Sequence, residues 1–215
     1  MMRFAQFILV ITAMLLAASC KLTPTQAYPE KDRFGLQAKG IDKATDSPSG
    51  AIRIQRVHVA PPYNQREFVY RTGELSYSSD YYNLFVADPQ DLITAEIVRG
   101  LTATGRFKSV LIGSSSADAP FKLEITVTRL EGDFQAQPKA VIAMHAVLLQ
   151  ESDALMRVVG ETDLEESGSI SSKAAGQLSS GWSQALGRCI AQLAEWSQSS
   201  MRAAAAATPN AAVRP

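Results

Sequence analysis

The sequence predicts an α+β fold, with one mainly antiparallel sheet and two principal helices packed on one face. Residues 121–127 alternate apolar and polar side chains, which is typical of a strand with one buried face. Two further segments, residues 88–105 and 172–200, carry apolar residues at helical spacing. Strand segments combined with two such stripes favour a sheet that is covered by helices on one side.

The first 19 residues are predicted to be a signal peptide. Arg3 precedes an apolar run over residues 4–18 that is too short to span a bilayer, and small residues stand directly before Cys20. This order resembles a lipobox, in which cleavage before a cysteine leaves a lipid-bearing first residue. The alternative is an ordinary signal peptide followed by a coincidental cysteine. Cys20 is therefore the predicted lipidation site, and residues 20–33 are the predicted lipidated N-terminus and tether.

Two features bear on localisation. Two or more acyl chains on Cys20 would anchor the protein stably, without any basic patch. Residue 21, directly after the cysteine, is a lysine. An aspartate at this position would resemble the signal that retains lipoproteins in the inner membrane. The resemblance therefore favours the outer membrane, with the domain on its periplasmic face.

The chain from residue 34 to residue 77 reads as short strands that are separated by turns. Residues 34–38 form a first predicted strand. Residues 52–60 form a second, in which the apolar alternation changes parity near Gln55 and so predicts a bulge. Residues 68–71 and 75–77 flank a Thr-Gly pair that predicts a hairpin turn.

The first predicted helix has clear limits. Asp88 suits the N-cap and Pro89 the first helical position, while Gly105 provides a stop. Its apolar stripe recurs every four residues at Ile93, Ile97 and Leu101. Residues 107–112 are the next predicted strand.

The second half of the chain predicts three strands and a long helix. The strands at residues 121–127, 141–149 and 155–159 are expected to form an antiparallel meander. The helix at residues 172–200 carries the apolar stripe Leu178, Trp182, Leu186, Cys189, Leu193 and Trp196. Residues 34–200 are thus expected to form a single domain, followed by a disordered Ala/Pro tail at residues 201–215.

Charge and cysteine content exclude several classes of function. Removal of Arg3 with the signal peptide changes the balance of 21 basic and 21 acidic residues to 20 and 21, so no nucleic-acid partner is expected. His58 and His145 lie in strand segments without a nucleophile motif, which predicts no catalytic site and no metal site. Cys189 lies on an apolar helix stripe and is expected to be buried. The protein is predicted not to be an enzyme and to need no cofactor besides the covalent lipid.

The segment from residue 56 to residue 85 is unusual because it holds five of the six tyrosines. Tyrosine combines a large apolar area with a polar tip, and it is enriched at interfaces. The alternative is a set of half-buried structural aromatics. As contacts to a partner we predict Tyr63, Arg66, Tyr70, Arg71, Tyr81 and Tyr82.

The same segment carries a family resemblance. V-A-P-P-Y, R-E-F-V-Y-R-T-G, D-Y-Y and a D-P helix start follow one another, and the chain then continues into L-x-x-x-G-x-F-x-x-V. This order resembles the ABC-type transport auxiliary lipoproteins, which include the paraquat-inducible protein C lipoprotein, over roughly residues 52–196. The resemblance implies an outer-membrane lipoprotein that works with an inner-membrane ABC transporter and its MCE-domain protein in moving lipids or related apolar molecules. It also implies a docking role, with contacts to a partner or to identical subunits.

Two other readings of the sequence stay open. A lipoprotein regulator or scaffold of cell-wall synthesis would share the anchor, the tether and a small α+β domain. Alternatively, the domain itself could carry lipid in an apolar cavity.

Overall fold

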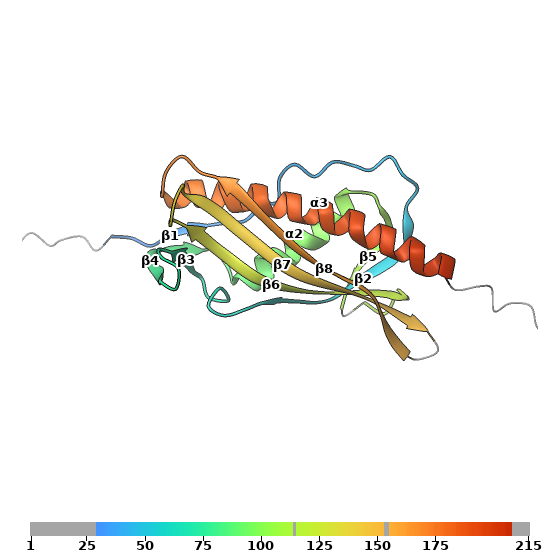
Figure 1. Ribbon diagram of the computed structural model, residues 1–215. Coiled ribbons are helices and arrows are strands. Elements are labelled where there is room, and N and C mark those ends of the chain that lie inside the picture. Colours follow the sequence, from blue (N-terminus) through green and yellow to red (C-terminus); the bar gives the residue numbers. More distant parts are fainter. Residues whose placement is uncertain (1–28, 114, 153–154, 208–215) are drawn as a thin grey trace, which may run out of the picture. The chain divides into compact units, whose positions relative to one another are not determined.

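The computed structural model describes residues 29–113, 115–152 and 155–207. The predicted signal peptide, Cys20 and residues 21–28 of the tether lie outside the described residues, as do residues 208–215 of the predicted tail. The chain divides into two units, Met1–Glu30 and Lys31–Pro215, and the strands and helices shown in Figure 1 belong to the second unit.

Eight strands and two helices are described in the second unit. The strands are β1 (Asp32–Phe34), β2 (Ser49–Val59), β3 (Glu67–Arg71), β4 (Tyr77–Phe85), β5 (Phe107–Ile112), β6 (Phe121–Asp133), β7 (Lys139–Ser152) and β8 (Leu155–Ser169). The helices are α2 (Pro89–Ala103) and α3 (Ala175–Ala207). The helix predicted to start after Asp88 and the strand predicted at residues 107–112 are both confirmed.

The prediction of a mainly antiparallel sheet is wrong, because the sheet is mixed. Among the described strands, the pairs β1–β4, β2–β5, β2–β6 and β3–β6 are parallel, and only β3–β4, β6–β7 and β7–β8 are antiparallel. The antiparallel pairs include the predicted meander. Side-chain alternation shows which face of a strand is buried, but it does not show the direction of the strand. In this fold α2 connects β4 to β5, and β5 then runs parallel to β2.

The long strand β6 organises the sheet. One edge of β6 pairs with β7 over its whole length, while β2 and then β3 share the other edge. The register between β2 and β6 shifts between Ile54 and Arg56, which confirms the bulge predicted near Gln55. Because of this shift, both Ile54 and Val57 are buried.

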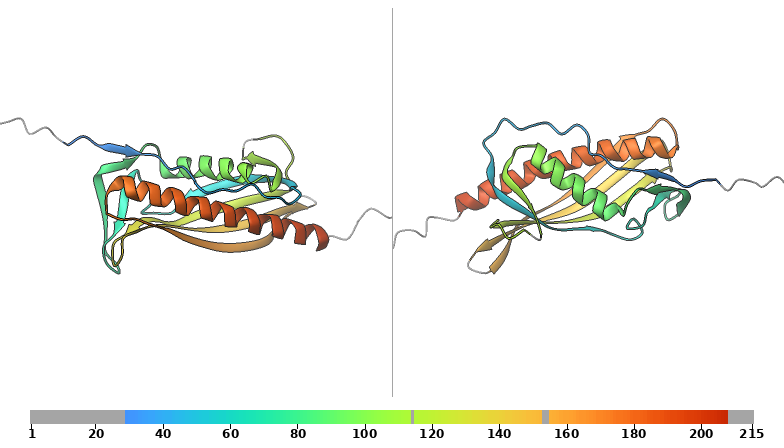
Figure 2. Two further views of the ribbon diagram at one scale, coloured as in Figure 1. Left: turned by 90° about the horizontal axis from the view of Figure 1, so that it is seen from above. Right: turned by 180° about the vertical axis from the view of Figure 1, so that it is seen from behind.

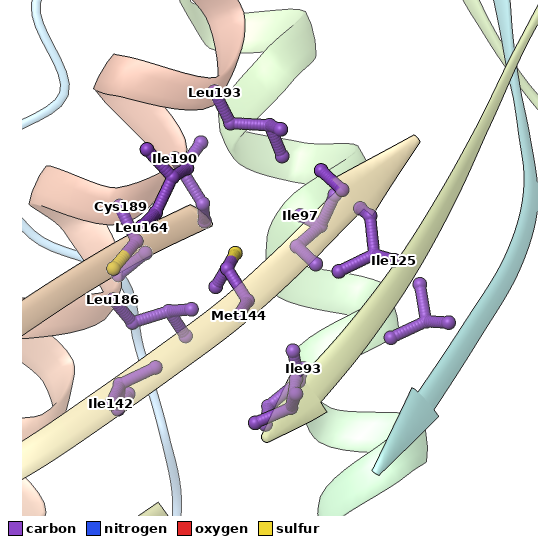
Figure 3. Packing of buried hydrophobic residues seen from close by; sticks show 14 of the residues in the cluster. Ile93, Ile97, Ile125, Ile142, Met144, Leu164, Leu186, Cys189, Ile190 and Leu193 are labelled. Carbon is purple, nitrogen blue, oxygen red and sulfur yellow. The ribbon is translucent and has the colours of Figure 1, made fainter. Parts of the chain in front are cut away.

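Both helices cover the same face of the sheet (Figures 1 and 2). The predicted stripes of α2 and α3 lie in the core, except that Trp196 is only partly buried. Ile97 of α2 and Ile190 of α3, which was not part of the predicted stripe, are fully buried. Figure 3 shows these side chains directed toward Ile125 and Met144 of the sheet. The helices therefore owe their stability to packing against the sheet rather than to local sequence alone.

Helix α3 continues to Ala207, so the prediction that a disordered tail begins at residue 201 is wrong for residues 201–207. Met201 and Ala204 are buried and face the rest of the domain. Alanine has the highest helix propensity, so the alanine run extends a helix that is already anchored by packing.

A strap, which we define as residues 35–48, crosses both helices. Of the strand predicted at residues 34–38, only Phe34 lies in a strand, where it is the last residue of β1. The first two residues of β1, Asp32 and Arg33, lie in the segment predicted to be the tether. The backbone N–H of Ala38 donates to the Glu96 carboxylate of α2 at 2.6 Å, and that of Lys39 donates to the Ser183 carbonyl of α3 at 3.1 Å. The strap thereby ties the start of the domain to both helices.

Candidate functional site

The structure separates the six predicted partner contacts into two groups. Tyr81 and Tyr82 are exposed, at 64% and 44% of their surface. The other four side chains are held by contacts within the domain. The exposed tyrosine surface consists of Tyr77, Tyr81 and Tyr82, all on β4, and Tyr77 was absent from the prediction.

Tyr63 is a structural residue. Its side chain is buried and its hydroxyl donates a hydrogen bond to the Glu131 carboxylate, which is itself fully buried. Burial, together with this hydrogen bond, raises the pKa of Tyr63 far above its ordinary value. Arg129 also donates to Glu131, at 2.7 Å, and so balances its charge. A partner could not reach Tyr63 without unfolding this network.

Tyr70 fixes the shape of the tyrosine surface from beneath. Its hydroxyl donates to the Asp80 carboxylate at 2.5 Å. Asp80 also accepts hydrogen bonds from the backbone N–H groups of Tyr82 and Asn83 and from the Asn83 side chain. Burial acts to raise the pKa of Asp80, but these hydrogen bonds outweigh it and lower the pKa. The ionised carboxylate thus holds the backbone that presents Tyr82.

A bulge in β4 directs the paired tyrosines outward. Glu67 of β3 pairs with Leu84, and the next residue, Phe68, pairs with Asp80. Residues 81–83 therefore have no partner on β3. The rings of Tyr81 and Tyr82 are perpendicular, with centroids 5.2 Å apart, and the Lys31 ammonium lies 3.8 Å from the Tyr81 ring centroid. These contacts hold two large aromatic side chains in a fixed arrangement at the surface.

The two predicted arginines support the backbone. Arg66 donates to the carbonyl oxygens of Phe85 and Val86. Arg71 donates to the carbonyl of Glu74, at 3.0 Å, in the turn between β3 and β4. Sequence reasoning missed Asp80 and Lys31. The D-Y-Y motif contained a usable signal for Asp80, because aspartate commonly accepts hydrogen bonds from backbone two residues ahead.

The tyrosine surface rests on an aromatic core. Phe68 contacts Phe85 and Trp182, with centroids 4.6 and 4.8 Å apart, and Phe34 of β1 lies 5.4 Å from Phe68. Trp182 in turn donates to the Glu131 carbonyl. Strands β1, β3 and β4 are thus fastened to α3, which gives the surface a rigid base.

The titratable residues that the structure describes provide no catalytic arrangement that we recognise. His58 is exposed, and His145 lies on the helix-free face, 2.9 Å from a carboxylate oxygen of Asp163. Burial raises the pKa of the Cys189 thiol to about 12, and nearby Glu166 adds to the effect. Within the described ranges, no cluster of three or more metal-binding side chains occurs. The helices in this part of the chain are also too short or too polar to cross a membrane.

Two hollows lie elsewhere on the domain. A polar hollow of about 370 Å³ is lined by the β5–β6 loop, Arg53, Lys122 and Glu151. A groove of about 450 Å³ with a mixed polar and apolar lining, which we call the α3–β8 groove, lies between the last turns of α3 and the start of β8.

Comparison with known proteins supports the fold and identifies the family. No curated protein matches the chain. Protein XCC0632 from Xanthomonas campestris, of the family DUF330, is 19% identical, with a TM-score of 0.70 over 81% of this chain and 99% of that one. An uncharacterised protein is 15% identical, with a TM-score of 0.52 over 83% of this chain and 99% of that one.

The decisive comparison is with a family of sequences. The sequence model of the family described as "ABC-type transport auxiliary lipoprotein component" matches residues 34–196. These residues include the apolar stripes of both helices and the tyrosine surface. Because this match covers most of the chain, the protein belongs to the ABC-type transport auxiliary lipoprotein family.

Proposed function

We propose that this protein is a membrane-anchored docking component of an ABC/MCE-type transport system that moves lipids or other apolar molecules across the cell envelope. Membership of an auxiliary lipoprotein family supports the association with transport. The lipobox-like sequence before Cys20 supports the anchor. Attachment to the outer membrane, on its periplasmic face, is the location that Lys21 favours.

The single observation that carries the docking role is the rigid presentation of Tyr81 and Tyr82. Large exposed aromatic side chains are the residues that most often dominate binding energy at protein interfaces. Asp80 and Lys31 already order these rings, so a partner would lose little conformational entropy on binding them. We therefore propose the tyrosine surface as the contact to the MCE-domain protein or to the transporter it serves.

The test is an affinity capture from gently solubilised envelopes, with bound proteins identified by mass spectrometry. Native protein should recover an MCE-domain protein and an ABC transporter. The double variant Tyr81→Ala/Tyr82→Ala should recover at least ~10-fold less of them, since each aromatic anchor contributes roughly 1–2 kcal/mol. Ile112→Ala is the matched control because Ile112 is an equally exposed apolar side chain on β5.

The outcomes separate the candidate roles. Both variants should unfold at the same urea concentration as the native protein, because neither change reaches the core. Equal capture by native protein and double variant would refute the role of the tyrosine surface. Recovery of a peptidoglycan synthase in place of transport proteins would instead favour a regulator or scaffold of cell-wall synthesis.

A further inference from the structure

The paired tyrosines of β4 form a surface corner that already holds a cation. We define the aromatic corner as Tyr81 and Tyr82, whose rings are perpendicular with centroids 5.2 Å apart. This contact fixes the orientation of Tyr81, and the Lys31 ammonium lies 3.8 Å from the centroid of its ring. The face of an aromatic ring carries a negative potential that attracts ammonium and guanidinium groups. The aromatic corner therefore binds a positive charge within this chain.

Lys31 is an occupant that can leave the aromatic corner. It directly precedes β1, which pairs in parallel with β4 so that Asp32 lies opposite Asn83. This register brings an extended segment past the corner and places the lysine beside Tyr81. Both Lys31 and Tyr81 are exposed. Because an exposed cation–π contact is weak, an incoming cation can replace the ammonium while β1 stays paired with β4.

Asp80 adds a negative charge beside the aromatic corner. Its carboxylate accepts hydrogen bonds from the Tyr82 N–H at 2.9 Å and from the Asn83 side chain at 2.7 Å. Burial acts to raise the pKa of Asp80, but its hydrogen bonds outweigh this effect and lower the pKa. The side chain is therefore ionised near neutral pH, and its charge favours a cation over an anion at the neighbouring rings.

We propose that the aromatic corner binds an arginine side chain of the docked partner in place of Lys31. A guanidinium is planar and less strongly hydrated than an ammonium, so it stacks on an aromatic face at a smaller cost of desolvation. The position of Lys31 shows that a cation carried by an extended protein segment reaches the ring. The inference rests on the proposed docking role and names the chemical group that the partner contributes.

Amide NMR of the full chain in mild detergent tests the aromatic corner without the partner. The probe is Nα-acetylarginine methylamide, and the matched control is the uncharged Nα-acetylnorleucine methylamide at the same ionic strength. Only the arginine probe should shift the amide signals of residues 80–83 saturably. The variant Lys31→Ala should bind it about 2- to 5-fold more tightly than the native protein, because no exposed cation–π contact has to be broken.

Two substitutions of Tyr81 separate the aromatic face from the apolar area. Tyr81→Phe keeps the ring and should bind the probe as the native protein does. Tyr81→Leu keeps an apolar side chain without a ring, so the saturable shift should disappear, even in combination with Lys31→Ala. Each of these changes lies at the surface, so urea unfolding should show the same midpoint as the native protein.

Other results of the titration would overturn the proposal. Equal shifts with the arginine and norleucine probes would mean that the contact is only apolar. Unchanged binding of the arginine probe by Tyr81→Leu would exclude the ring as its site. Binding of phosphatidylcholine vesicles that disappears in Tyr81→Leu, without any shift by the arginine probe, would assign the aromatic corner to a lipid headgroup instead.

Failure of the docking role would give a different pattern in the envelope capture. Tyr81→Phe should recover as much partner as the native protein, and Tyr81→Leu should recover about 2- to 5-fold less. Native protein that captures no transport proteins would refute the docking role, while the titration would still decide whether the corner binds arginine. Capture that is lost in Tyr81→Ala/Tyr82→Ala but unchanged in Tyr81→Leu would overturn the arginine contact and leave the docking role intact.

Discussion

Replacing Gly187 with alanine should separate the strap from α3. A Cβ atom at this position would overlap the Lys39 carbonyl oxygen and lie 2.8 Å from the carbonyl carbon. The strap would have to move away, and the hydrogen bond from the Lys39 N–H to the Ser183 carbonyl would be lost. So would the bond from the Gln37 N–H to the Ser183 hydroxyl, at 3.2 Å.

The magnitude follows from these losses. Two hydrogen bonds contribute about 2 kcal/mol together. Partial exposure of the buried Leu36 side chain adds about 1–2 kcal/mol. The higher helix propensity of alanine offsets up to ~1 kcal/mol of this loss in stability. The free energy of unfolding should therefore fall by about 2–3 kcal/mol, which corresponds to a decrease in Tm of roughly 5–10 °C for a domain of this size.

Gly176→Ala is the matched control in the same helix. A Cβ at Gly176 would meet only the Phe34 ring, at an ordinary contact distance of 3.9 Å. Urea and thermal unfolding should show Gly176→Ala to be as stable as the native protein or slightly more stable. Equal stability of Gly187→Ala and Gly176→Ala, with unchanged exchange of the Lys39 amide, would refute the reasoning.

Three further predictions concern other parts of the domain. Tyr63→Phe removes a donor from the buried Glu131 carboxylate and should lower the free energy of unfolding by about 1–3 kcal/mol in urea. The pKa of the Cys189 thiol is higher in the folded state, at about 12, than in an unfolded chain, at about 8.5. The free energy of unfolding should therefore fall by up to roughly 1.4 kcal/mol per pH unit as the pH rises between these two values. Cys189→Ala should lessen this pH dependence, as measured by urea unfolding. Arg53→Met removes hydrogen bonds to the carbonyls of Ser115 and Ala117, so limited proteolysis should cut the β5–β6 loop sooner, and an unchanged rate would contradict this role.

The outcome at the predicted contact residues shows what sequence reasoning lacks. Tyr63 and Tyr81 are the same residue type, and both lie in the same aromatic segment. One is buried against Glu131, 68 residues away in the chain, and the other is exposed beside Lys31. Local sequence cannot distinguish them because burial of Tyr63 depends on a strand that pairs far along the chain. For the same reason the α3–β8 groove, formed by residues about 45 positions apart, could not be predicted.

The sequence by itself determined the local elements and the family. Periodicity placed the buried stripes of both helices, a parity change located the bulge near Gln55, and the order of short motifs identified the auxiliary lipoprotein family. Each of these features depends on residues that are close in the chain. Tertiary structure alone decided the mixed strand directions, the helical course of residues 201–207 and the exposure of Tyr81. Strand direction and burial follow from contacts between distant segments, and these contacts leave no fixed pattern in the local sequence.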